Sequence, residues 1–404
     1  MLEQRNLPEF GIEGVSQINL NLKKIVERKN GIVSHLKGGI QTLLKGRKVD
    51  LVNGTARFIS KNEVEVTTTG GSQKISAKNV IIATGSTWRD LPNLKADGEF
   101  ILNSDHMLDI KELPKRLLVV GGGVIGCEFA SIMNAFGVDV TVVEVLDQLL
   151  PAEDASVARM LSLFFKKRGI KVITKTSVAS INGGRVTLSD NSAVETDKVL
   201  VSVGRRPYTD GLNLEAVGIE TERGFVLTDE SMRTNVSNIF AIGDVAVPRS
   251  TKSKPALAHV ASREGIVAVK AIKSQATIDY KVVPRPVFTI PEVACVGLTE
   301  KELKTSGVKY KTGRFSYGAL SKAVCDGQEG GLIQVYADES DFIIGCHCIG
   351  NHAGDICSEI AVAMRNNLTI SKITDTIHAH PTYSEIIPEA LEDVHSMAIH
   401  KAKG

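Results

Sequence analysis

The stretch RLLVVGGGVIGCEFASIMNAFGVDVTVVE, residues 116–144, decides the fold class of this chain. It contains an apolar strand, a glycine turn, a helix and a second apolar strand, which is the pattern of one β-α-β unit in a parallel sheet. Gly121, Gly123 and Gly126 form a G-x-G-x-x-G motif directly after the first strand. In such a motif the first glycine permits a tight turn, the second lets a diphosphate approach the backbone, and the third lets helix and strand pack closely. The stretch therefore predicts an α/β chain with a dinucleotide-binding, Rossmann-like domain.

Glu144, which ends the second strand, predicts which dinucleotide is bound. Its carboxylate would accept hydrogen bonds from the adenosine ribose hydroxyls and repel a 2′-phosphate, so NAD is favoured over NADP. Within the motif, Cys127 is interpreted as a helix-packing residue rather than a nucleophile, because no other cysteine lies nearby in the sequence. Glu128 has two interpretations. It is either a first-turn glutamate whose negative charge interacts favourably with the helix dipole, or a residue at the nicotinamide.

Size and charge limit the classes of protein that remain. At 404 residues the chain is long for one hydrophobic core, so we expect two or three domains. Lys plus Arg (48) nearly balances Asp plus Glu (46), which argues against nucleic acid and anionic membranes as partners. No apolar run approaches the ~20 residues that span a bilayer. The start, MLEQRNLPEF, lacks the layout of a secretory signal, so we expect a soluble protein of a reducing compartment.

Six cysteines are scattered along the chain and are interpreted mostly as small buried apolar residues. Cys346, Cys348 and Cys357, with two histidines nearby, invite a zinc interpretation. Their spacing matches no usual zinc site, and alternate residues on a strand are poor chelating neighbours. Cys325 lies in a polar stretch and is expected to be an exposed thiol. No metal site is predicted.

Apolar periodicity predicts further helices and strands outside residues 116–144. Two runs, KNVIIATGS and NIFAIGDV, have the continuous apolar character of strands buried in a parallel sheet, and ligand-facing turns often follow such strands. From about residue 283 the pattern changes to strands followed by helices, which predicts an α+β domain. The other predicted elements are a helix over residues 18–46, strands within 49–58 and 63–67, a helix over 155–169, a strand over 170–174, a hairpin around 182–184 and a buried strand over 198–204.

The segment HAHPTYSE, residues 378–385, has two interpretations. His380 precedes a proline, which holds it extended, and Thr382 with Glu385 fits the T-x-x-E capping box of a following helix. On this interpretation Glu385 is a capping residue and His380 a loop residue. Alternatively, His380 accepts protons while Glu385 binds its other ring nitrogen, which fixes the tautomer and stabilises the imidazolium. Such a pair can withdraw the proton of a thiol, and the thiolate is the reactive form.

Five motifs together resemble the flavin disulfide oxidoreductases, and the set most resembles the dihydrolipoamide dehydrogenases among them. They are GGGVIGCE, VSVGRRP, NIFAIGDV, TIPEVACVGLTE and HAHPTYSE, in this order, and the resemblance covers essentially the full chain. HAHPT separates the chain from the glutathione reductases, which resemble it but lack the first histidine and prefer NADPH. The resemblance implies a partial FAD-binding domain over residues 1–114 and 238–282, an NAD-binding domain over 115–237 and a C-terminal α+β dimerisation domain over 283–404.

The resemblance also implies site residues. His380 resembles the base that serves the dithiol of the partner subunit, with Glu385 orienting it, so a symmetric homodimer is implied. The helix start at 256–259 would face the flavin and stabilise negative charge on it. The implied FAD contacts are Gly54, Thr84, Gly85, Ser86, Gly243, Asp244, Ala256, Leu257, Ala258 and His259, and the NAD contacts are Gly121, Gly123, Gly126, Glu128, Glu144, Val178 and Gly204.

The implied reaction is hydride exchange between dihydrolipoamide and NAD⁺ through FAD, in the service of 2-oxoacid dehydrogenase or glycine cleavage complexes, in the cytoplasm or the mitochondrial matrix. Family members also carry an N-terminal G-x-G-x-x-G for FAD and a C-x-x-x-x-C redox disulfide. Neither occurs in these residues, so we expect the chain to begin beyond both and its FAD binding to be weakened. A catalytically silent NAD-binding dimer and an NADH diaphorase are the alternatives that this difference leaves open.

Overall fold

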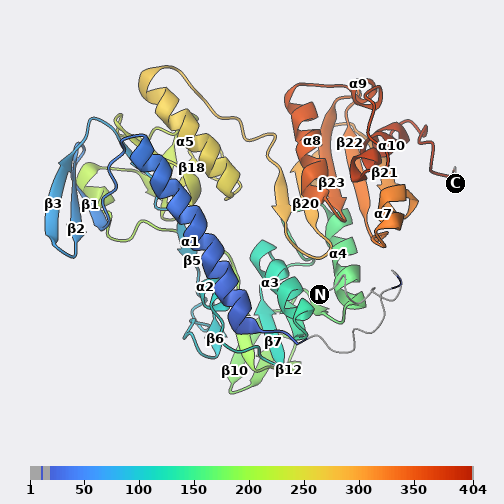
Figure 1. The fold of residues 1–404 in the computed structure, drawn as a ribbon, viewed down its shortest axis with the longest axis horizontal. Helices are drawn as coiled ribbons and strands as arrows, with labels where there is room; N and C mark the ends of the chain where they lie inside the picture. The colour runs from blue at the N-terminus through green and yellow to red at the C-terminus, as the bar shows by residue number, and fades with distance from the viewer. Residues whose placement is uncertain (1–10, 12–18, 403–404) are drawn as a thin grey trace. The chain divides into compact units, whose positions relative to one another are not determined.

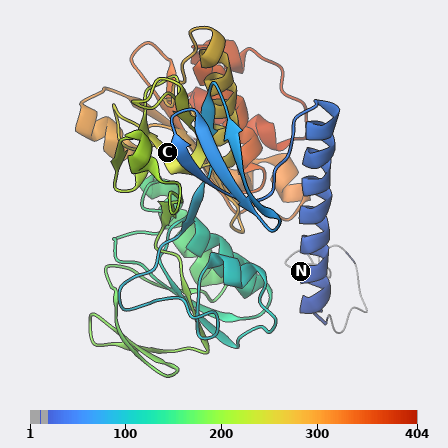
Figure 2. The same ribbon diagram turned by 90° about the vertical axis from the view of Figure 1, so that its left-hand side faces the viewer.

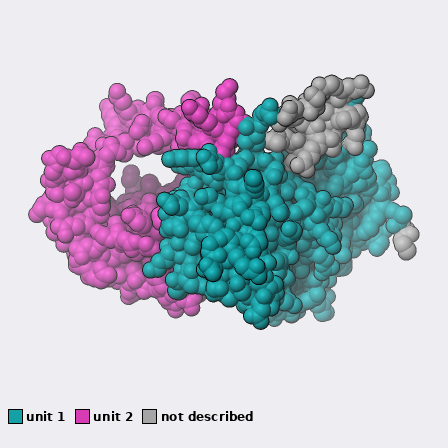
Figure 3. All heavy atoms as spheres, turned by 90° about the horizontal axis from the view of Figure 1, so that it is seen from below, with its two compact units in different colours: residues 1–20, 90–203, 281–404 teal, residues 21–89, 204–280 magenta. Residues whose placement is uncertain are grey.

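The computed structural model describes residue 11 and residues 19–402, and the chain divides into two compact units (Figure 3). The first unit comprises Met1–Leu20, Asp90–Val203 and Lys281–Gly404, and the second comprises Asn21–Arg89 and Gly204–Tyr280. Each unit is therefore built from segments that lie far apart in the sequence. Within the described residues, no helix is both long and apolar enough to cross a membrane.

The predicted β-α-β unit is confirmed and forms the middle of a five-stranded parallel sheet in the first unit. Leu118 and Val119 have no exposed surface, as expected for a parallel strand that is covered on both faces. The sheet order is β6-β13-β7-β8-β9, and all neighbouring strands are parallel. The elements are β6 (Ile101–Leu102), α2 (Ser104–Leu108), β7 (Arg116–Val120), α3 (Val124–Ala135), β8 (Asp139–Val143), β9 (Lys171–Ile173) and β13 (Lys198–Val201).

Helix α4 (Ala155–Lys167) confirms the helix predicted over residues 155–169. Asp154 begins the helix by accepting the backbone N–H of Ser156, a typical N-cap bond. Val157, Leu161 and Phe165 recur at helical spacing and are fully buried in the core that α4 shares with the parallel sheet. The predicted hairpin is also confirmed, within the antiparallel strands β10 (Val178–Asn182), β11 (Arg185–Leu188) and β12 (Ala193–Glu195).

The α+β domain predicted after residue 283 is confirmed as an antiparallel sheet of order β19-β20-β23-β22-β21 with its helices (Figure 1). Alternate residues of β20 enter two cores: Val293 and Cys295 pack with residues of α4, whereas Ala294 and Val296 pack with residues of α8. Both faces of the sheet are therefore covered. The strands are β19 (Arg285–Val287), β20 (Val293–Gly297), β21 (Lys311–Ser316), β22 (Leu332–Ala337) and β23 (Ile343–Ile349), and the helices are α6 (Glu300–Ser306), α7 (Ser321–Cys325), α8 (Ala353–Arg365), α9 (Ile370–Thr374) and α10 (Ile386–Asp393).

The second unit contains α1 (Leu22–Gly46), one continuous helix that confirms the helix predicted over 18–46 (Figure 2). Ile18, which we counted in that pattern, lies outside the described residues. Asn21 begins the helix by accepting the backbone N–H of Lys24 at 3.0 Å. None of the residues of α1 is buried, although its apolar side chains recur at helical spacing. The periodicity therefore predicted the helix correctly, but the apolar face that it implies is not buried.

The strand predicted within residues 49–58 is shorter than expected. Residues 49–54 form no strand, and β1 (Thr55–Ser60) begins after Gly54. Val49, Leu51 and Val52 are exposed, so an apolar run alone did not define a strand here. The strand predicted at 63–67 is confirmed as β2 (Glu63–Thr68), which pairs on both sides, with β1 and with β3 (Gly71–Ser76).

Two predicted parallel strands of the second unit end at the same edge. Strand β4 (Val80–Ile82) pairs in parallel with β17 (Ile239–Ala241), so the turns that follow them meet. These turns are 84–86 and the short 3₁₀ helix η3 (Gly243–Val245). The surrounding elements are β5 (Ser86–Trp88), β14 (Arg205–Pro207), η2 (Leu214–Val217), β15 (Thr221–Glu222), β16 (Phe225–Thr228), β18 (Ala246–Pro248) and α5 (Ala258–Lys273).

Candidate functional site

The glycine turn between β7 and α3 is shaped by close backbone packing. Gly121 has φ +106°, and a Cβ there would lie 2.6 Å from the backbone oxygen of Ser202. A Cβ on Gly126 would overlap the backbone oxygen of Gly121. Both positions therefore require glycine for the helix to leave the strand at this distance.

The start of α3 is open toward an anion. Gly123 is the N-cap residue, no side chain caps the helix, and the first turn carries no acidic residue. A Cβ on Gly123 would meet nothing within 4 Å, so the backbone faces open space at this point. Unpaired N–H groups and the positive end of the helix dipole favour a diphosphate here. The described residues thus fit the diphosphate of a dinucleotide.

Glu144 is held at the carboxyl end of β8 with only 6% of its surface exposed. Its Oε2 accepts the backbone N–H of Gly122 at 2.6 Å, and its Oε1 accepts that of Leu146 at 2.8 Å. Each oxygen keeps a second lone pair with which to accept a ribose hydroxyl. The Glu144 carbonyl also accepts the N–H of Thr176, which brings the segment leading to Val178 beside it. Gly204, with φ +106°, belongs to the second unit.

Glu128 does not occupy the first turn of α3, so the interpretation as a first-turn glutamate is wrong. It lies in the second turn, and its Oε1 accepts the backbone N–H of Phe288 at 2.9 Å. Burial raises the pKa of the Glu128 carboxyl, and the Phe288 N–H partly opposes this shift. Cys127 is buried, as expected for a packing residue, and burial raises the pKa of its thiol, which keeps it neutral.

The turns after β4 and β17 are joined by hydrogen bonds within the second unit. The hydroxyl of Ser86 donates to Asp244 Oδ2 at 2.7 Å. Arg205 donates from Nε to the Ser86 hydroxyl at 2.7 Å and from Nη2 to the Ser86 carbonyl at 2.8 Å. The hydroxyl of Thr84 donates to the carbonyl of Tyr208 at 2.6 Å. The structure thus brings together three of the expected residues and adds Arg205, which we had quoted only as part of a motif.

The start of α5 resembles the start of α3 in being uncapped. Leu257 is the N-cap residue in an extended conformation, it makes no side-chain cap bond, and the first turn, which includes Ala258 and His259, has no acidic residue. The positive end of the helix dipole at this start fits a site that accumulates negative charge, as a reduced flavin does. Ala256 precedes this turn. Gly54 lies against Val66 and Thr67, where a Cβ would approach the Thr67 carbonyl oxygen to 2.5 Å, and this packing explains the glycine without a ligand.

The contacts that each interpretation of HAHPTYSE requires are present together. Glu385 Oε1 contacts His380 Nδ1 at 2.8 Å, while Oε2 accepts the backbone N–H of Thr382 at 2.8 Å and completes the predicted capping box. Burial alone would raise the pKa of the Glu385 carboxyl, but the Thr382 N–H and His380 hold it below its usual range. The His380 side chain is 67% exposed, so its ring can meet a partner molecule.

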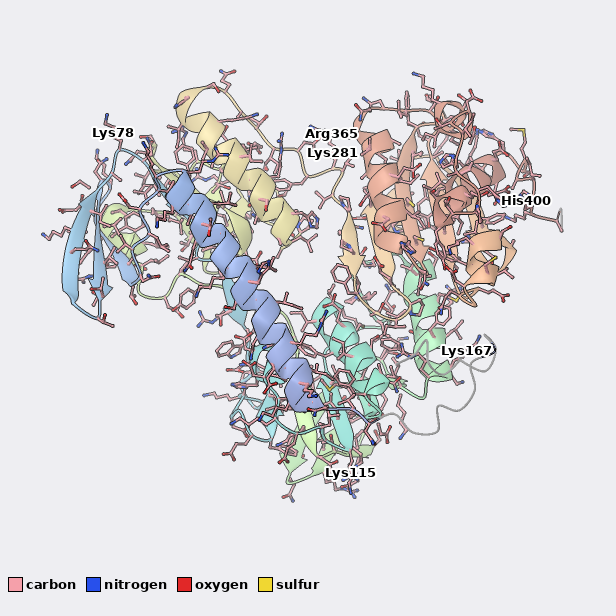
Figure 4. All side chains as sticks on the ribbon, viewed as in Figure 1. Lys78, Lys115, Lys167, Lys281, Arg365 and His400 are labelled. Atoms are coloured by element: carbon pink, nitrogen blue, oxygen red, sulfur yellow. The ribbon has the colours of Figure 1, made fainter. Side chains whose placement is uncertain are left out.

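His380 and Glu385 line a cavity of about 490 Å³, and two further histidines line it as well. His378 Nε2 contacts Glu359 at 3.0 Å, and His400 Nδ1 contacts Glu389 at 2.6 Å (His400 is labelled in Figure 4). His378 entered the sequence analysis only as the first histidine of HAHPT, and His400 was missed, because its partner lies eleven residues earlier and leaves no local signal. A larger cavity of about 910 Å³ lies between α4 and β9, and neither His380 nor Glu385 lines it.

Five of the six cysteines are buried, as predicted, and Cys325 is exposed. Burial raises the pKa of Cys295 and Cys348, which keeps both thiols neutral. Cys346 and Cys348 belong to the core beside α8, where the Cys348 Sγ lies 3.3 Å from the hydroxyl of Tyr317. Across residues 19–402, no three or more His, Cys, Asp or Glu side chains are arranged to hold a metal ion.

Comparisons with known proteins match this geometry over nearly the whole chain. Residues 3–265 match the family model of pyridine nucleotide-disulphide oxidoreductases, and residues 283–391 match the dimerisation domain of that family. A dihydrolipoyl dehydrogenase of Bacillus subtilis is 38% identical over 98% of the chain and 86% of its own length. A mitochondrial dihydrolipoyl dehydrogenase of Pisum sativum is 37% identical over 96% and 78%, respectively.

Solved structures agree with these matches. LpdA from Mycobacterium tuberculosis superposes with a TM-score of 0.88 at 29% identity, over 97% of this chain and 86% of its own. The HOCl-induced flavoprotein disulfide reductase RclA from Escherichia coli gives a TM-score of 0.82 at 26% identity, over 91% and 85%. The expected fold class is therefore confirmed.

Proposed function

The chain belongs to the pyridine nucleotide-disulphide oxidoreductase family, and from this premise we propose which of its residues bind each cofactor and which act on the substrate. It is a dihydrolipoyl dehydrogenase-type, NAD-dependent disulfide oxidoreductase with FAD and NAD as cofactors, and it carries the dimerisation domain of a homodimer. We assign NAD to the turn at 121–126 with Glu144, and FAD to Ser86, Asp244 and the start of α5. We assign thiol deprotonation to His380 with Glu385.

The observation that carries this proposal is the open helix start behind the glycine turn. Gly121 and Gly126 need to be glycine for packing, but Gly123 does not, since a Cβ there would meet no protein atom within 4 Å. A glycine that no packing contact requires, at the N-cap of a helix without a side-chain cap, leaves the space that the close approach of a ligand needs. Glu144 then supplies the acceptor for a ribose.

His380 moves the proton of the reaction. Because Nδ1 faces Glu385, Nε2 is the nitrogen that accepts a thiol proton. The carboxylate stabilises the imidazolium that results, and the thiolate left behind is the electron donor. FAD, when bound, supplies the two-electron relay between dithiol and NAD⁺. The two thiols of dihydrolipoamide become a disulfide, and NAD⁺ becomes NADH with release of a proton.

We further propose a partial FAD-binding domain over residues 1–114 and 238–282, an NAD-binding domain over 115–237 and a dimerisation domain over 283–404. The partners proposed are the components of a 2-oxoacid dehydrogenase or glycine cleavage complex. The compartment proposed is the cytoplasm, or the mitochondrial matrix in a eukaryote. The mitochondrial relative of Pisum sativum is consistent with the second location.

Lipoamide reduction by NADH tests the assignment. We expect His380→Asn to lower lipoamide-linked turnover by about 10²–10⁴-fold, the usual contribution of a general base. NADH binding, measured by nucleotide fluorescence, should stay within about twofold of wild type, because the substitution removes no dinucleotide contact. Equal turnover of variant and wild type would remove His380 from the reaction.

The cysteines favour a second candidate, an NADH diaphorase. Of the six, five are buried, and Cys325 alone is exposed, so the described residues do not themselves present a pair of reactive thiols. A flavin-loaded protein without such a pair would pass electrons from NADH to dyes rather than to lipoamide. Yellow protein that reduces a dye but not lipoamide would support this candidate, whereas lipoamide turnover at a comparable rate would exclude it.

A further inference from the structure

A buried ion pair lies directly behind the Gly243–Asp244 turn. Glu264 of α5 has no exposed surface, and the side chain of Lys254 is only 3% exposed. Glu264 Oε1 accepts hydrogen bonds from the ammonium of Lys254 and from the hydroxyl of Tyr280, the latter at 2.6 Å. Its Oε2 accepts the backbone N–H of Gly243 at 2.6 Å. Every oxygen of this carboxylate is therefore engaged.

Stability alone does not explain this arrangement. Removing two charges from water costs several kcal/mol per ion, and apolar side chains of the same volume often stabilise a core as well or better. The Glu264 carboxylate instead points at the backbone of a turn whose next residue is a candidate ligand contact. The backbone conformation agrees with this view: Gly243 has φ +70°, which glycine adopts without strain, and the hydrogen bond to Glu264 restricts this flexible residue to that one conformation.

The turn is held from two sides. Glu264 fixes its backbone at Gly243, and Ser86 fixes its side chain by donating to Asp244 at 2.7 Å, with Arg205 donating to Ser86 in turn. Lys254 attracts both carboxylates, Glu264 by contact and Asp244 through space. Lys254 is thus the buried cation that both carboxylates share.

We propose that Glu264, supported by Lys254 and Tyr280, is a positioning residue of the FAD site. It holds the Gly243–Asp244 turn in the geometry that accepts hydroxyl groups of the flavin's polyol chain, so that the turn is formed before the cofactor binds. The inference rests on the proposed role of Asp244 as an FAD contact. Glu264 itself touches no cofactor in this account and acts through the turn.

The test separates FAD affinity from stability in the full-length protein. The apoprotein is titrated with FAD by flavin fluorescence, and its melting temperature is recorded without the cofactor. Glu264→Ala removes the acceptor for Gly243 and should weaken FAD binding by about 10–100-fold, as expected for a lost hydrogen bond to a charged group. Glu264→Gln keeps an acceptor oxygen and should recover most of the affinity.

The first unit offers a matched control. Glu153 is a buried carboxylate that binds the Arg285 guanidinium at 3.1 Å, and neither residue belongs to the proposed FAD site. Glu153→Ala should lower the melting temperature as Glu264→Ala does, but should leave the FAD dissociation constant within about twofold of wild type. If Glu264→Ala does not fold, Tyr280→Phe replaces it, with a smaller expected loss of about threefold, because the bond from Gly243 to Glu264 remains and only a supporting bond to the carboxylate is removed.

Asp244→Asn distinguishes the two ways in which the account can fail. If this variant loses FAD affinity while Glu264→Ala, Glu264→Gln and Tyr280→Phe all bind FAD as wild type does, Glu264 has no positioning role and the assignment of Asp244 stands. If Asp244→Asn binds FAD as wild type does, or if wild type binds none, the assignment of Asp244 fails and the role of Glu264 fails with it. A loss in Glu153→Ala equal to that in Glu264→Ala would also overturn the inference.

Discussion

The turns at 121–126 and at 243–244 follow the same local order, an apolar strand and then a glycine, but different forces hold them. At the first turn, backbone contacts decide, because a side chain on Gly126 would overlap the carbonyl oxygen of Gly121. At the second, a Cβ on Gly243 would make an ordinary contact of 3.4 Å with Ala261. That turn is held instead by Glu264, twenty-one residues further along the chain. The turn at 121–126 is thus held by close packing between residues near it in the fold, whereas the turn at 243–244 is held by polar contacts with residues distant in the sequence.

This difference affects how each turn responds to change. A turn fixed by close packing tolerates no added atom, but it needs no partner beyond the neighbouring strands. A turn fixed by a buried ion pair has room for a methyl group, but it depends on several residues staying charged and hydrogen-bonded. Substitutions in the first should therefore act through volume, and substitutions around the second through charge.

The largest effect is expected at the third glycine of the first turn. Gly126→Ala must push α3 away from β7, and overpacking of this kind costs up to about 3 kcal/mol. NADH affinity should fall by roughly 100-fold or more, since the helix start that faces the diphosphate moves with the helix. Chemical denaturation and NADH titration of the same variant measure the two effects.

Gly123→Ala is the matched control, because its added methyl group would meet no protein atom. The unfolding free energy should change by less than about 1 kcal/mol, the helix-end cost of losing glycine. NADH binding should nevertheless weaken, because the methyl group occupies the space that the diphosphate needs. If Gly123→Ala binds NADH as tightly as wild type does, the diphosphate does not lie at this turn.

The first turn was readable from the sequence because its determinants are short-range. The spacing of the three glycines and the position of Glu144 follow from one strand, one turn and one helix, and the structure has these elements where the pattern predicted them. HAHPTYSE was readable for the same reason, since His380, Thr382 and Glu385 meet within a single turn of chain.

The support of the second turn was not readable. Lys254, Glu264 and Tyr280 are spread over a loop, a helix and the chain beyond it, and no fixed spacing links them to Gly243. A glutamate inside an amphipathic helix pattern is normally assigned to the solvent face. Tertiary packing buries Glu264, and neither helix propensity nor hydrophobic periodicity predicts this burial. The position of Glu128 was misjudged by one turn, because it is the fifth residue of α3, which begins at Val124.

Glu144→Gln is expected to have the next largest effect. The carboxylate accepts two backbone N–H groups, from Gly122 and Leu146, and the amide can accept only one of them well. We expect NADH affinity to fall by about 1–3 kcal/mol, from the lost bonds to a charged group. Calorimetric titration measures this loss, and discrimination against NADPH should decrease because the repulsive charge is gone. Unchanged affinity for NADH would remove the ribose contact from the account.

Gly243→Ala should have a smaller effect than Gly126→Ala. The methyl group has space, so the cost is conformational: φ +70° is unfavourable for alanine by about 1–2 kcal/mol. The thermal midpoint of the apoprotein should fall accordingly, and the bond from Gly243 to Glu264 should survive. A loss of stability as large as that of Gly126→Ala would mean that volume, rather than polar contacts, governs this turn too.

The smallest effects expected are on how the unfolding free energy changes with pH. Glu128, near the first turn, and Lys254, near the second, should contribute slopes of opposite sign. Burial raises the pKa of Glu128, opposed by Phe288, and it lowers the pKa of Lys254, opposed by Glu264 and Asp244. Folded Glu128 binds its proton more tightly than the unfolded chain does, so stability falls as pH rises between the unfolded and the raised folded pKa.

Folded Lys254 binds its proton less tightly, so between its lowered folded pKa and its unfolded pKa the unfolded state holds more protons and stability rises with pH. Glu128→Gln should therefore flatten the acid limb of a plot of unfolding free energy against pH, and Lys254→Met should flatten the alkaline limb. The slopes carry the test, because Lys254→Met also leaves Glu264 without its cation and lowers stability at every pH. Urea titrations across the pH range measure them, and an alkaline slope that is the same with and without Lys254 would show that its charge is not linked to folding.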